Sequence, residues 1–84
     1  MSDYIITFHT VSDALYFEKI ARSELAVETI TVPRKLSTSC GYAIRASDVA
    51  NVDQIDAFVQ RKDICYSEIF LAENGDYHLI ATSS

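Results

Sequence analysis

One stretch of the sequence combines a cysteine with residue types that can activate it. It runs Pro33-Arg34-Lys35-Leu36-Ser37-Thr38-Ser39-Cys40, contains the only proline of the chain, and is followed directly by Gly41. The thiolate is the nucleophilic form of cysteine, and neighbouring cations lower the pKa of a thiol. Arg34 and Lys35 therefore favour a thiolate at Cys40, although a cysteine that begins a strand is more often a small buried apolar residue. The stretch indicates a thiol site without defining its reaction.

The second cysteine and the two histidines do not extend this site into a metal centre. Cys65 follows Cys40 by 25 positions, neither cysteine belongs to a C-x-x-C pair, and His9 and His78 lack ligand-like spacing. Zinc and iron–sulfur sites are therefore not expected, and no cofactor is implied. In the absence of an export signal, the two cysteines are typical of reduced cytoplasmic thiols rather than of a disulfide.

Length and charge limit the classes of partner. The 84 residues, 49% of them hydrophobic, predict one domain over residues 1–84. A domain of this size is expected to have modest stability, which self-association into a homo-oligomer would increase. The net charge of −5 repels nucleic acids and anionic membranes. The N-terminus lacks the pattern of a signal peptide, and no apolar run approaches the ~20 residues of a membrane span. We therefore expect a cytoplasmic protein that binds neither nucleic acid nor membrane.

The elements that must position Cys40 follow from the apolar pattern. Strands are predicted over Tyr4–Phe8, Val27–Val32, Gly41–Ala46, Ile64–Leu71 and Tyr77–Ala81. Helices are predicted from Asp13 to about Leu25, with Ser12 as N-cap, and from about Val49 to Arg61, with Ser47-Asp48 as cap. Asn74-Gly75 predicts a hairpin turn between the last two strands.

This order of elements predicts an α+β fold of the ferredoxin-like, split βαβ class (βαββαβ) with an extra C-terminal edge strand. Two helices would cover one face of an antiparallel sheet. The first helix and the third strand then begin at the same end of the sheet, so Cys40 is expected near Thr10 and Ser12. Both are candidate supporting residues, because the positive end of a helix stabilises a thiolate. Cys65 is expected inside an apolar strand, where burial raises the pKa of a thiol. We therefore expect Cys65 to be a packed, structural residue rather than a reactive one.

The sequence also resembles the selenium/sulfur carrier protein-like family of small bacterial domains. The resemblance rests on Tyr4-Ile5-Ile6-Thr7-Phe8, on Asp13-Ala14-Leu15 with Glu18-Lys19, and on Val32-Pro33-Arg34 followed by Ser37, Ser39, Cys40 and Gly41. It covers roughly residues 4 to 71, and the Pro-Arg…Ser-Cys-Gly pattern is its most specific part. His9-Thr10-Val11 departs from the proline or smaller residue expected at that turn, which leaves the rim of the site less well matched.

The resemblance implies that Cys40 carries a sulfur or selenium atom as a persulfide or its selenium equivalent. The partners it implies are a protein donor, such as a cysteine desulfurase, and an acceptor protein, so the chain would be a carrier rather than an enzyme. Ser37, Thr38 and Ser39 can donate hydrogen bonds to the anion, and Arg34 and Lys35 can balance its charge. Gly41 leaves space beside the sulfur for a partner's cysteine.

Two other functions fit part of the sequence. The first is a ligand-sensing or protein-interaction domain that self-associates through its sheet and performs no thiol chemistry. The second is RNA binding of the RNA-recognition-motif type, which Gly41-Tyr42-Ala43-Ile44 partly matches. Cys40 stands where that motif has Lys or Arg, and the charge of −5 opposes RNA binding, so this function is the weaker alternative.

Overall fold

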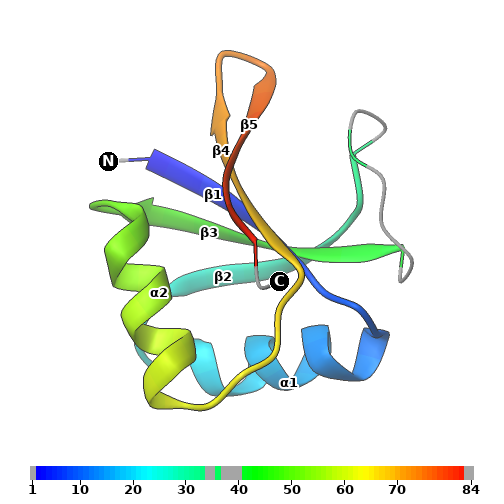
Figure 1. Ribbon diagram of the computed structural model, residues 1–84, viewed down its shortest axis with the longest axis vertical. Coiled ribbons are helices and arrows are strands. Elements are labelled where there is room, and N and C mark those ends of the chain that lie inside the picture. Colours follow the sequence, from blue (N-terminus) through cyan, green and yellow to red (C-terminus); the bar gives the residue numbers. More distant parts are fainter. Residues whose placement is uncertain (1, 34–35, 37–40, 83–84) are drawn as a thin grey trace.

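The computed structural model describes residues 2–33, 36 and 41–82. The elements of this part of the chain are, in order, β1 (Ser2–Thr7), α1 (Val11–Ala21), β2 (Ala26–Thr31), β3 (Tyr42–Val49), α2 (Val52–Arg61), β4 (Glu68–Glu73) and β5 (Asp76–Thr82) (Figure 1). The strands form one antiparallel sheet in the order β2-β3-β1-β4-β5. The predicted α+β, ferredoxin-like fold is confirmed, with β5 added at the edge beyond β4.

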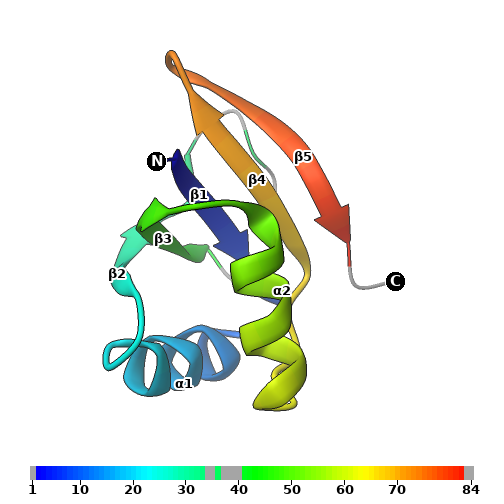
Figure 2. The same ribbon diagram turned by 90° about the vertical axis from the view of Figure 1, so that its left-hand side faces the viewer.

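Both helices pack on one face of the sheet, as Figure 2 shows from the side. Ile6 of β1 and Phe8, which directly follows the strand, belong to the same buried cluster as residues of α1 and α2. Phe17 of α1 joins the layers: its ring centroid lies 5.4 Å from that of Phe8 and 5.6 Å from that of Phe58 on α2. Burial of these apolar side chains holds the helices against the sheet.

Helix α1 begins two residues earlier than predicted. Its N-cap is Thr10, whose side-chain oxygen accepts a hydrogen bond from the backbone N–H of Asp13 at 3.2 Å. Ser12 lies inside the first turn, so its prediction as the cap is wrong. Both residues are good caps, but it is the Thr10 hydroxyl that pairs with an N–H group of the first turn. Asp13 lies in that turn, where the helix dipole favours an acid.

The prediction that Ser47-Asp48 caps the second helix is also wrong. These residues belong to β3, which continues to Val49 and pairs there with Ser2 across an irregularity in the register. Asp48 has φ 57°, a left-handed conformation that short polar residues tolerate. The N-cap of α2 is Asn51, which accepts a hydrogen bond from the N–H of Gln54 at 3.3 Å. Pairing with β1 therefore prevails over the local capping signal.

The fourth strand is shorter than predicted, whereas the hairpin after it is confirmed. Residues 64–67 form no strand, and Ile64 donates a backbone hydrogen bond back to Val59 of α2 at 2.9 Å. In the hairpin, Asn74 and Gly75 both have positive φ, at 52° and 81°, between the paired residues Glu73 and Asp76. Two consecutive left-handed residues are what a type I′ turn requires.

Tyr66, in the segment between α2 and β4, makes the stability of the fold sensitive to alkaline pH. Burial raises the pKa of its phenol above the ordinary 10.0, and the negative charge of Asp56 adds to the rise. The folded protein thus holds the neutral phenol more firmly than the unfolded chain does. This contribution to stability is complete below pH 10 and disappears as the pH rises through the folded-state pKa.

We expect the free energy of unfolding of Tyr66→Phe to fall less steeply above pH 10 than that of the wild type. Urea unfolding at a series of pH values measures the slope, and Tyr16→Phe on the exposed side of α1 is the matched control. Parallel pH profiles for the wild type and Tyr66→Phe would contradict the assignment.

Candidate functional site

The start of β3 and the start of α1 meet at one end of the sheet, which is the arrangement that the candidate thiol site needs. Thr7, the last residue of β1, pairs with Ala43 of β3, and α1 begins after a short turn at Val11 (Figure 1). Gly41 therefore lies at the end of the sheet where the N-terminus of α1 lies. An anion near such a helix end is stabilised by its dipole and its unpaired N–H groups.

Gly41 is fixed by its backbone. Its carbonyl oxygen accepts a hydrogen bond from Val32 N–H at 3.1 Å, which closes the connection between β2 and β3. Its φ of 78° is a conformation that favours glycine. No described atom lies within 4 Å of the position that a Cβ would take. The reason for glycine in the described surroundings is therefore its backbone conformation, and crowding does not require it.

Among the other predicted site residues, the structure describes two. Thr10 is exposed and its hydroxyl serves as the cap of α1, while Ser12 is exposed in the first turn of that helix. Arg34, Lys35, Ser37, Ser39 and Cys40 lie outside the described residues, and so does Thr38.

An apolar groove, not predicted from the sequence, adjoins this end of the sheet. It has a volume of about 310 Å³ and is lined by Val11, Ala14, Leu15, Thr29 and Tyr42. Leu15 and Tyr42 are 51% and 44% exposed, so the groove presents apolar side chains to solvent. Val11 and Leu15 are apolar residues outside the buried stripe of α1, a pattern that does not by itself indicate a groove. Tyr42, which lines the groove, directly follows Gly41 in the sequence.

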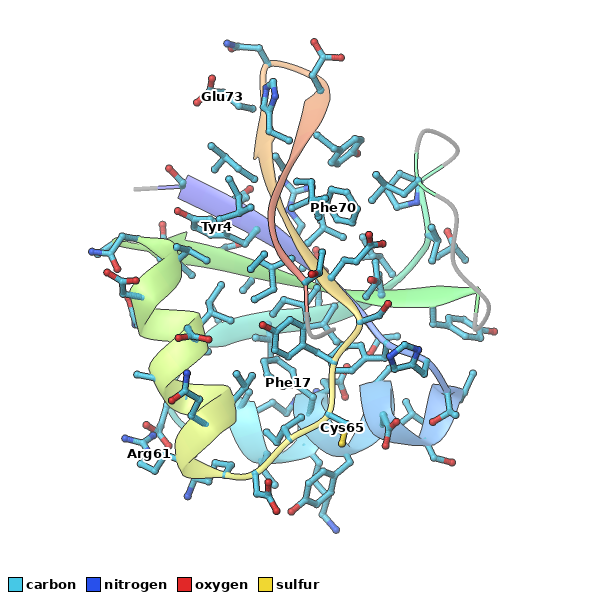
Figure 3. The ribbon with its side chains drawn as sticks, viewed as in Figure 1. Tyr4, Phe17, Arg61, Cys65, Phe70 and Glu73 are labelled. Carbon is cyan, nitrogen blue, oxygen red and sulfur yellow. The ribbon has the colours of Figure 1, made fainter. Side chains whose placement is uncertain are left out.

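Cys65 is not the packed residue that was predicted. It is exposed, and it lies between α2 and β4 rather than inside a strand (Figure 3). The burial on which its structural role was argued is therefore absent. An exposed thiol is accessible to reagents, so an experiment on sulfur transfer has to distinguish Cys65 from Cys40.

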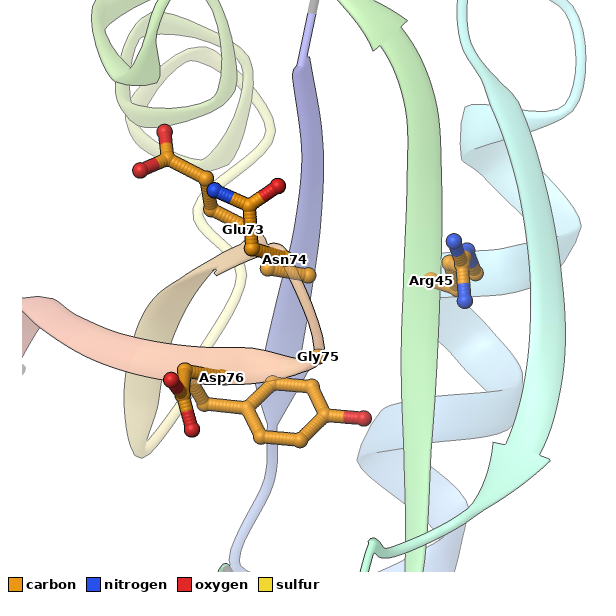
Figure 4. A pocket seen from close by; sticks show the side chains of 7 residues that line it. Arg45, Glu73, Asn74, Gly75 and Asp76 are labelled. Atoms are coloured by element: carbon orange, nitrogen blue, oxygen red, sulfur yellow. The ribbon is translucent and has the colours of Figure 1, made fainter.

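A second cavity lies at the opposite end of the sheet and has a different character. It measures about 160 Å³, and Arg45 and the β4–β5 turn from Glu73 to Asp76 line it (Figure 4). Arg45 forms an ion pair with Asp3, and the hydrogen bond to that carboxylate raises the pKa of Arg45 further. The positive charge of Arg45 is thus balanced by Asp3. The described residues contain no group of three or more His, Cys, Asp or Glu arranged to hold a metal ion.

Comparison with known proteins identifies the family. A family model described as "Putative Se/S carrier protein-like" matches residues 3–71. The chain belongs to this family. Neither the curated proteins nor the solved structures give a significant match.

The match to the Se/S carrier protein-like family includes every candidate site residue and both cysteines, and it ends at Leu71 within β4. Strand β5 therefore lies outside the matched region. No helix in the described part of the chain is both long and apolar enough to cross a bilayer.

Proposed function

We propose that this member of the Se/S carrier protein-like family carries a sulfur or selenium atom on Cys40. The observation that carries the proposal is the position of Gly41, the residue after Cys40, at the end of the sheet where α1 begins. A thiolate near a helix N-terminus gains from the dipole, and Arg34 and Lys35 add positive charge in the same loop. Ser37 and Ser39 supply hydroxyl donors for the anion.

The transfer step needs only a thiolate and a donor persulfide. The Cys40 thiolate attacks the outer sulfur of the donor persulfide, the S–S bond of the donor breaks, and the donor leaves as a thiolate. Cys40 then carries the persulfide, and the same displacement by an acceptor thiolate returns Cys40 to its starting form. Electrons balance without an external oxidant. Selenium is transferred in the same way when the outer atom of the donor is selenium.

The apolar groove beside Gly41 supports a protein donor and a protein acceptor. A partner cysteine that reaches Cys40 brings its neighbouring residues over Leu15 and Tyr42, whose exposed apolar surface favours contact with a protein segment. Desolvation there would also strengthen the electrostatic stabilisation of the thiolate. We assign the donor role to an enzyme of the cysteine desulfurase class and place the exchange in the cytoplasm. Because the carrier is consumed and regenerated stoichiometrically, it acts as an accessory protein.

The test is to load the wild-type protein with labelled sulfur from a cysteine desulfurase and its substrate cysteine. We expect the protein to gain one labelled sulfur atom that a reductant removes, and mass spectrometry of proteolytic fragments should find it on the fragment with Cys40. The matched control is the same protein alkylated before the reaction. A protein that stays unlabelled although the desulfurase turns over, or that carries the label on Cys65, would overturn the proposal.

A further inference from the structure

We propose that strand β5 pairs with β5 of a second copy of this chain, so that two sheets join into one. β5 is the last strand of the sheet that the described residues form, and none of their strands pairs with its outer edge. Backbone N–H and C=O groups along such an edge can bond to another extended strand. Leu79 and Ile80 on this strand are among the large apolar residues that remain exposed, Leu79 by 54%.

The two edges of the sheet differ in how they are protected. At the other edge, β2 carries the exposed charge of Glu28, its Thr29 is hydrogen-bonded to Glu18 of α1, and Pro33 follows it. Charged residues, prolines and covering helices are devices that prevent edge-to-edge pairing. From Tyr77 to Thr82, β5 contains no Asp, Glu, Lys, Arg, Pro or Gly. β5 therefore lacks the devices that β2 has.

An apolar row across the sheet leads to this edge. Ile5 of β1 pairs with Phe70 of β4, and Phe70 pairs with Leu79 of β5. Because Tyr4 and Ile6 face the helices, alternation places this row on the opposite face of the sheet. The row becomes more exposed toward the edge: Ile5 is fully buried, Phe70 is half-buried and Leu79 is half exposed. A side chain from a further strand beside β5 would cover Leu79 in the way that Phe70 of β4 helps to cover Ile5 of β1.

Charge and symmetry favour a second copy as the partner. The net charge of −5 opposes self-association in general. Near β5, however, the acidic residues Glu73 and Asp76 stand at the hairpin turn, at one end of the strand. In a symmetric antiparallel pair the two turns lie at opposite ends, so these charges stay apart while the uncharged parts meet.

The proposed pairing is separate from the carrier chemistry. β5 lies outside the region that matches the family, whereas all candidate thiol-site residues lie inside it. One strand edge with a few side chains buries less than the ~800 Å² per partner of a typical stable interface. We therefore expect a dimer that dissociates on dilution, with a dissociation constant in the micromolar range.

Sedimentation analysis over a wide concentration range tests the proposal under reducing conditions. We expect the wild-type protein to shift from monomer to dimer as its concentration rises. Leu79→Lys should weaken the dimer at least about tenfold, because it places a charge on the pairing edge. Tyr16→Lys is the matched control, since Tyr16 is 53% exposed but lies on α1, and it should leave the equilibrium unchanged.

Three outcomes would overturn the proposal. They are a wild type that remains monomeric at every concentration, a dimer that Leu79→Lys leaves intact, and a dimer that Tyr16→Lys disrupts instead. Leu79→Thr keeps the strand propensity and should weaken the dimer as well, so it replaces the lysine variant if circular dichroism shows that the latter is unfolded. Hydrogen exchange gives an independent reading, because outer-edge amides of β5 should become protected as the wild-type concentration rises.

Discussion

Replacing Phe17 with alanine is expected to remove most of the stability of this protein. Phe17 is fully buried between the two helices and the sheet, and its ring contacts those of Phe8 and Phe58. Large-to-small substitutions of buried Phe cost about 3–5 kcal/mol, because burial is lost and a cavity remains. Small domains have total stabilities of roughly 5–15 kcal/mol, and an 84-residue chain belongs near the lower end of that range.

Urea unfolding measured by circular dichroism gives the loss directly. Tyr16→Ala is the matched control: it removes a neighbouring aromatic residue of the same helix, but Tyr16 is 53% exposed. The free energy of unfolding of Tyr16→Ala should stay within about 0.5 kcal/mol of that of the wild type, apart from a small gain from the higher helix propensity of alanine. A loss below about 1 kcal/mol for Phe17→Ala would show that Phe17 does not join the layers as described.

The core and the order of the elements could be predicted because apolar periodicity reports burial directly. Of the stripe predicted for the first helix, Ala14, Phe17, Ala21 and Leu25 are buried and Ile20 is partly buried. Of the stripe predicted for the second helix, Ile55, Phe58 and Val59 are buried and Val52 is partly buried. The hairpin could be predicted because Asn-Gly satisfies a backbone requirement that few other pairs satisfy.

Element boundaries were harder to predict, because local signals competed with pairing. Ser47-Asp48 has the residue types of a helix cap, but the backbone there is better satisfied by continuing β3 along β1. Ile64-Cys65-Tyr66 has the composition of a strand, yet the chain needs these residues to return from α2 to the sheet. The left-handed Asp63, at φ 53°, begins that return. The exposure of Cys65 follows from this route.

For the candidate site, the sequence correctly predicted only at which end of the sheet the neighbouring strand and helix begin. The topology implied that the third strand begins beside the first helix, and the pairing of Thr7 with Ala43 agrees. The groove could not be predicted, because its lining comes from three elements whose relative orientation is a tertiary property. Val11, Leu15 and Tyr42 carry no local pattern that distinguishes a shared groove from scattered surface residues.

Replacing Cys40 with serine is expected to abolish sulfur loading by a persulfide donor, while Cys65→Ser retains it. Serine keeps the size and polarity of the side chain but cannot form a persulfide. Cys65 is exposed, so its replacement should cost little stability and provides a control of matched chemistry. Loading is measured with labelled cysteine and a desulfurase, and circular dichroism verifies the fold of each variant. If Cys65→Ser lost the label and Cys40→Ser kept it, the two roles would be reversed.

The same two single-cysteine proteins test why Cys40 should be the nucleophile. In Cys65→Ser, the rate of alkylation by iodoacetamide reports the ionisation of Cys40 as the pH is varied. Cysteines near a helix N-terminus and cations have pKa values about 1–5 units below the ordinary ~8.5, so the rate should reach its plateau at a correspondingly lower pH. Changing Arg34 and Lys35 to Gln should move the midpoint upward, and added salt should do the same in part. A midpoint at or above the ordinary value in the unaltered loop would remove the electrostatic basis for a thiolate at Cys40.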